Sequence, residues 1–76
     1  MEEVLLSPKV EREARKLLAQ IIRADSVIVA VKAGALAEGF VRGIATVGAL
    51  RAGGAKNLYV VFEMALEERL KSLASL

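Results

Sequence analysis

The stretch from Val27 to Glu63 decides the fold that we expect for this chain. It holds two short apolar runs, Val27-Ile28-Val29-Ala30-Val31-Lys32 and Leu58-Tyr59-Val60-Val61-Phe62, separated by a long segment rich in small residues. Both runs are β-branched or aromatic and are bounded by turn residues, which favours buried strands over helix segments. Between them we expect a turn at Gly34, a helix from about Ala35 to Ala52, and a left-handed cap at Gly53-Gly54. This order predicts a right-handed βαβ unit with parallel strands.

The flanking segments extend this unit in both directions. Glu3-Val4-Leu5-Leu6 is expected to be a short strand, and Ser7-Pro8 is a strong signal for the start of a helix. Apolar residues then recur at helical spacing as far as Ile21, and a second periodic pattern runs from Met64 to Leu76. The sequence therefore predicts a single α/β domain over 1–76, with a two-layer β-α-β-α-β core over 1–63 and a C-terminal helix over 64–76.

The composition excludes several classes of chemistry. The chain has 76 residues and contains neither cysteine nor histidine, which removes disulfides, most zinc sites, and catalysis by a thiol or an imidazole. We expect no metal and no cofactor, a cytoplasmic location and no membrane span. Hydrophobic residues make up 55% of the chain, more than a small two-layer monomer readily buries, so we expect part of them to be covered by a partner.

No catalytic or cofactor-binding motif fits the sequence. Gly34 and Gly39 have the spacing of a phosphate-binding loop, but Phe40-Val41 stands where lysine and serine or threonine are needed. The same segment lacks the middle glycine of a dinucleotide-binding fingerprint. Glu38 lies four residues before Arg42, where an ordinary ion pair is expected rather than a catalytic acid. We therefore do not expect an enzyme.

The predicted middle helix carries few charges and three glycines, Gly39, Gly43 and Gly48. Each glycine costs up to about 1 kcal/mol in a helix interior, so their retention indicates close approach of another backbone. One interpretation is a homodimer, in which we expect the interface to contain Val41, Gly43, Ala45 and Gly48. The alternative is a tightly packed contact within one chain.

The turn at Gly34 and Ala35, next to Lys32, is the one candidate for a binding site. Free N–H groups at the start of a helix that follows a glycine turn favour phosphate. The alternative is that such a turn only connects a strand to a helix.

The predicted order of elements, together with the turn Ala33-Gly34-Ala35-Leu36, resembles the Alba superfamily of small dimeric nucleic-acid-binding proteins. The turn and the opening Met1-Glu2-Glu3-Val4-Leu5-Leu6-Ser7 are similar to its branch that contains stage V sporulation protein S. This resemblance implies a homodimer that holds DNA or RNA against the first loop and the end of the second strand. The nucleic-acid-binding residues would then be Lys9, Lys32, Gly34 and Ala35, with Arg51 and Lys56 at the other end of the middle helix.

Two functions follow from these observations. The first is a non-enzymatic, weakly sequence-selective nucleic-acid-binding homodimer of Alba type. The loop Ser7-Pro8-Lys9 and the alanines beside Gly34 carry less positive charge than the family usually has at these positions. The second function is therefore a protein-interaction or regulatory module of the same fold that has lost the nucleic-acid-binding face.

Overall fold

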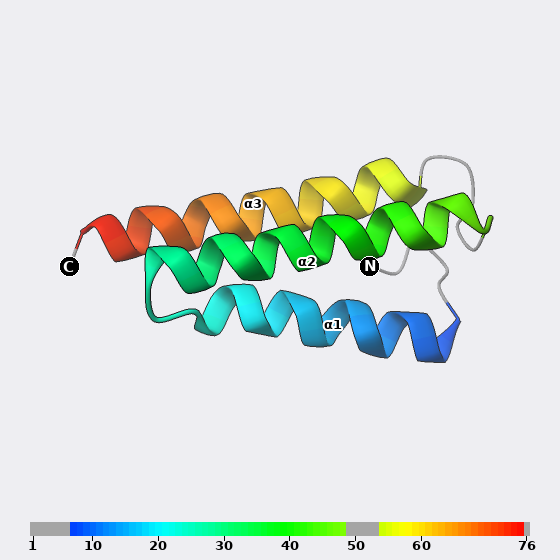
Figure 1. Cartoon of the computed structure of the whole chain (residues 1–76), viewed down its shortest axis with the longest axis horizontal. Coiled ribbons are helices and arrows are strands. Elements are labelled where there is room, and N and C mark those ends of the chain that lie inside the picture. Colours follow the sequence, from blue (N-terminus) through cyan, green and yellow to red (C-terminus); the bar gives the residue numbers. More distant parts are fainter. Residues whose placement is uncertain (1–6, 49–53, 76) are drawn as a thin grey trace.

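The structure is a computed structural model that describes residues 7–48 and 54–75. These residues form three helices, α1 (Pro8–Arg23), α2 (Val27–Thr46) and α3 (Gly54–Ala74). The helices lie side by side in alternating directions and form an elongated bundle of 39 × 18 × 16 Å (Figure 1). Each helix packs against both of the others. Because the described residues contain no strand, the predicted α/β fold with a β-α-β-α-β core is wrong.

Both apolar runs that we predicted to be strands are helical. Val27–Lys32 forms the start of α2, and residues 58–62 lie within α3. In α2 the buried residues Ala30, Ala33, Ala37 and Val41 recur at helical spacing, and in α3 Leu58 and Phe62 lie four residues apart in the core. The strand preference of β-branched residues spans only about 1 kcal/mol, so packing at helical spacing outweighs it. The strand expected at residues 3–6 lies outside the described residues.

Serine side chains cap the first two helices. The Ser7 hydroxyl accepts a hydrogen bond from the Val10 N–H at 3.3 Å, and Pro8 occupies the first helical position, which confirms the predicted start of α1. The Ser26 hydroxyl accepts from the Val29 N–H at 3.2 Å and caps α2 in the same way. The segment before Val27 is therefore a turn between two helices, not the predicted connection into a strand.

The helix ends also differ from the prediction. α2 ends at Thr46, and Gly48 then has a φ of +70°, the left-handed conformation that glycine adopts at low cost after a helix. Gly54 is not a cap but the buried first residue of α3, and Gly53 lies outside the described residues. The helix predicted over 64–76 is thus the second half of a longer helix.

The core lies along the axis of the bundle. It contains Leu17 and Ile21 from α1 and Leu58 and Phe62 from α3, whereas α2 contributes mainly alanines. Arg69 of α3 adds a polar contact between the elements, because its Nε donates a hydrogen bond to the Ala24 carbonyl oxygen at 2.7 Å. This bond holds α3 against the turn between α1 and α2.

Candidate functional site

In its first half, α2 turns alanines inward and its large apolar residues outward. Its buried side chains are Ala30, Ala33, Ala37 and Val41. The first half of the helix, in contrast, has large apolar side chains that are exposed to solvent, namely Val27, Ile28, Val29, Val31 and Leu36. A helix that is apolar on every side is normally buried on every side. The exposed surface of α2 is therefore our candidate functional site.

One strip of this surface faces away from the rest of the bundle. We define the outer strip as Ile28, Val31, Ala35, Gly39 and Gly43, which follow one another at spacings of three or four residues and are all exposed. Ile28 is 69% exposed, and Val31 is 51% exposed. A Cβ atom built on Gly39 or on Gly43 would meet no atom of the described residues within 4 Å, apart from the adjoining backbone of α2 itself. The strip thus has a bulky N-terminal half and a C-terminal half without side chains at two positions.

These two glycines bear on the close packing expected from the sequence. No other described part of the chain packs against Gly39 or Gly43, because the space beside each is open. The alternative, a tight contact within one chain at Gly39, Gly43 or Gly48, is not seen among the described residues, although Leu66 of α3 does approach Gly34. A contact of Gly39 or Gly43 with a second chain stays a prediction.

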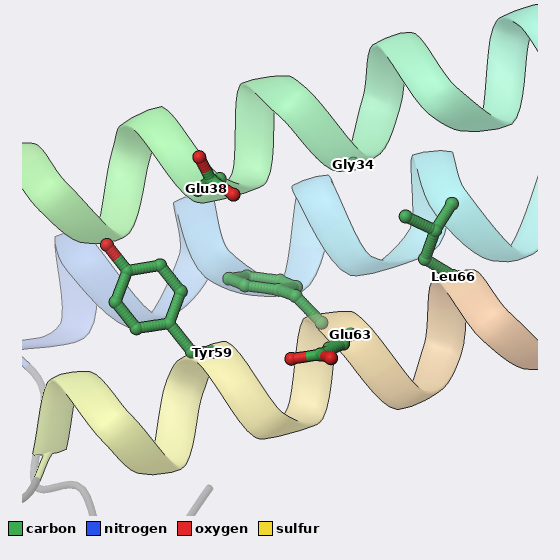
Figure 2. Close-up of a pocket in the computed structure, with 6 residues that line it drawn as sticks. Gly34, Glu38, Tyr59, Glu63 and Leu66 are labelled. Atoms are coloured by element: carbon green, nitrogen blue, oxygen red, sulfur yellow. The ribbon is translucent and has the colours of Figure 1, made fainter.

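A second feature is a hollow between α2 and α3. It has a volume of about 250 Å³ and is lined by Gly34, Glu38, Tyr59, Phe62, Glu63 and Leu66 (Figure 2). Tyr59 and Leu66 of α3 point toward α2 at its two ends (Figure 2). Both carboxylates are exposed, and Glu38 forms the expected ion pair with Arg42 at 3.3 Å. The hollow therefore lacks the buried, convergent polar groups that characterise a small-molecule site.

The predicted nucleic-acid-binding lysines that the structure describes do not form one surface. Lys9 and Lys56 lie in the first turns of α1 and α3, which begin at the same end of the bundle (Figure 1). Lys32 lies in the half of α2 that is nearer to the other end. Arg51 lies outside the described residues.

The predicted phosphate-binding turn is absent. Gly34 and Ala35 are in the interior of α2, well beyond the first four residues, whose N–H groups lack a partner within the helix. Their N–H groups are therefore used in the helix itself, and the physical basis for placing phosphate there is lost.

The four residues predicted for a dimer interface divide into two groups. Val41 is fully buried in the core of the bundle, so it is not available to a partner unless the bundle opens. Gly43, Ala45 and Gly48 are exposed. The sequence does not single out Ile28 and Val31 when residues 27–32 are interpreted as a buried strand. The helical spacing of Ala30, Ala33, Ala37 and Val41 was the signal that could have identified them.

Within the parts of the chain that the structure describes, none of the helices combines the length and hydropathy that a bilayer-crossing segment requires. In those same parts, no three potential metal-ligating side chains come together.

Comparison with protein-family models, with curated proteins and with solved structures finds no match to this chain. The resemblance to the Alba superfamily therefore gains no support from a relative, and the α/β fold that it implies is contradicted by the three helices.

Proposed function

We propose that this chain is a non-enzymatic protein-interaction module that forms a homodimer through the exposed surface of α2. The observation that carries this proposal is the orientation of α2, with alanines in the core and larger apolar side chains in solvent. Full burial of a valine, leucine or isoleucine side chain contributes about 1.5–3 kcal/mol, and the single chain gains only part of it from Ile28, Val31 and Leu36.

The position of charge favours a protein partner over nucleic acid. Between Val27 and Ala37, Lys32 is the one charged residue of α2. Binding to a phosphate backbone needs several cations on one face, whereas Lys9, Lys32 and Lys56 are distributed between the two ends of the bundle. A surface that binds another protein needs the opposite arrangement, with apolar residues at the centre and charges around it.

A cytoplasmic location, inferred from the lack of cysteine, stays a prediction.

Sedimentation equilibrium over about 10–500 μM tests this proposal. We expect a reversible monomer–dimer equilibrium for the natural chain, and loss of the dimer in Ile28→Glu. Met64→Glu is the matched control, because Met64 is 66% exposed and lies on α3. A monomer at every concentration would overturn the homodimer, and equal loss in the two variants would show that α2 is not the contact surface.

A further inference from the structure

The outer strip of α2 is complementary to itself when it is reversed. Ile28 and Val31 project from its N-terminal half, and Gly39 and Gly43 leave open space in its C-terminal half, with Ala35 between them. A two-fold interface uses the same patch on both subunits, so each patch must fit its own rotated copy. An antiparallel pair of α2 helices meets this condition, because it sets the bulky half of each helix against the glycine half of the other.

We propose that two copies of this chain pair through antiparallel α2 helices, with the two-fold axis close to Ala35. This inference rests on the proposed function and specifies its geometry. Residues at equal distances on either side of Ala35 then meet at the same level. Val31 of one copy faces Gly39 of the other, and Ile28 faces the aliphatic part of Arg42.

The glycines support a contact outside the single chain. A helix-interior glycine costs about 1 kcal/mol relative to alanine. At Gly34 the absence of a side chain allows close packing inside the bundle, because Leu66 occupies the space. At Gly39 and Gly43 no other part of the described chain approaches, so we infer that the gain that offsets the cost comes from another molecule.

The charges favour the antiparallel direction. Lys32 and Glu38 lie three residues before and after Ala35, so the axis brings Lys32 of one copy to the level of Glu38 of the other. Lys32 forms no ion pair among the described residues, whereas Glu38 already pairs with Arg42. In a parallel pair, Arg42 would meet Arg42 and Lys32 would meet Lys32. Like charges at such positions oppose association.

The size of the strip sets the strength of the dimer. The strip covers residues 28–43, which span about 24 Å along the helix, and a helix is about 10 Å wide, so the strip offers about 240 Å² per copy. Stable complexes bury about 800 Å² per partner. Leu36 and Val29 beside the strip add to the contact, but we still expect a weak dimer that forms at micromolar or higher concentrations.

Disulfide trapping tests the geometry directly, because the chain has no cysteine of its own. Ala35→Cys alone should form a covalent dimer in a glutathione redox buffer at about 300 μM protein. Ile28→Cys alone should not, because the two copies of residue 28 would be about 21 Å apart at a rise of 1.5 Å per residue. A disulfide needs Cα atoms within about 7 Å. A mixture of Ile28→Cys and Arg42→Cys, with one chain tagged, should give the mixed dimer.

The outcomes separate this inference from the proposed function. Ready dimerisation of Ile28→Cys alone, without the mixed product, would overturn the antiparallel arrangement and favour a parallel one. Trapping of Met64→Cys as efficient as that of Ala35→Cys would show random collision and would also overturn it. If sedimentation shows a dimer but Ala35→Cys is not trapped, the homodimer stands and this geometry is wrong. If sedimentation shows only monomer, the proposed function itself fails.

Discussion

Gly34 of α2 lies directly against Leu66 of α3, and a Cβ atom at Gly34 would be 2.7 Å from Cδ2 of Leu66. This is the position where the missing side chain of a glycine lets two helices of the bundle approach closely. Because the atom in the way is the end of a side chain that is only partly buried, a small substitution can be accommodated by movement of Leu66. A large substitution adds further atoms on the side of α3, so movement of this one side chain relieves less of the overlap.

Gly34→Leu should therefore destabilise the bundle. We expect a loss of about 1–3 kcal/mol in the free energy of unfolding, the usual cost of overfilling a packed contact. Urea denaturation followed by circular dichroism, at a protein concentration where the chain is monomeric, measures it. Gly39→Leu is the control, because its side chain would enter open space, and a similar loss in both variants would contradict the assigned contact.

Gly39→Ala and Gly43→Ala should each stabilise the monomer. Alanine replaces glycine in a helix interior with a gain of up to about 1 kcal/mol, and neither new Cβ atom meets a neighbour within 4 Å. The same urea titration checks this result.

Gly39→Leu should keep the monomer folded and yet weaken the dimer at least tenfold, which sedimentation would detect. An unchanged dimer in Gly39→Leu would exclude Gly39 from the interface.

Arg69→Ala should loosen the connection between α3 and the turn that joins α1 to α2. The Arg69 guanidinium donates to the Ala24 carbonyl oxygen at 2.7 Å, and Ala24 is 2% exposed. Loss of this hydrogen bond leaves a buried carbonyl without its donor, so we expect a cost of about 1–2 kcal/mol in thermal or urea unfolding. Arg42→Ala is the control, since its exposed ion pair with Glu38 should contribute less than about 0.5 kcal/mol.

Ser26→Ala should weaken the start of α2. The hydroxyl of Ser26 accepts the Val29 N–H, and replacement of such a cap typically costs about 1 kcal/mol. Ser26→Asp should retain most of the stability because its carboxylate can accept the same bond. Ser72→Ala, on the exposed side of α3, should change the unfolding free energy little. Equal stability of Ser26→Ala and the natural chain would show that the cap contributes nothing.

Local signals were predictable from the sequence, and the fold was not. The start of α1 depends on Ser7 and Pro8 alone, and the ion pair of Glu38 with Arg42 depends only on their spacing, so both predictions are confirmed. Whether residues 27–32 form a strand or a helix depends instead on how the whole segment packs. Valine and isoleucine favour a strand only weakly, and the decisive packing, in the core that α2 shares with α1 and α3, involves residues distant in the sequence. The same error concealed the candidate site, because Ile28 and Val31 were interpreted as core.

Exchange of the charges at Lys32 and Glu38 tests the antiparallel dimer without a covalent trap. Lys32→Glu would set the new carboxylate of each copy at the level of Glu38 of the other, so the dimer should weaken. Exposed ion pairs contribute about 0.2–1 kcal/mol each, and a dimer contains two of them, so we expect a rise in Kd of about 2- to 30-fold. The double variant Lys32→Glu with Glu38→Lys restores opposite charges between the copies and should recover most of the affinity. Both effects should shrink at about 0.5 M NaCl, where the Debye length is only a few ångströms. In a parallel pair, like charges would lie at the same level in the natural chain and again in the double variant. Lys32→Glu would then cause no loss of affinity that Glu38→Lys could restore. Failure of the double variant to recover the affinity would therefore contradict the antiparallel arrangement.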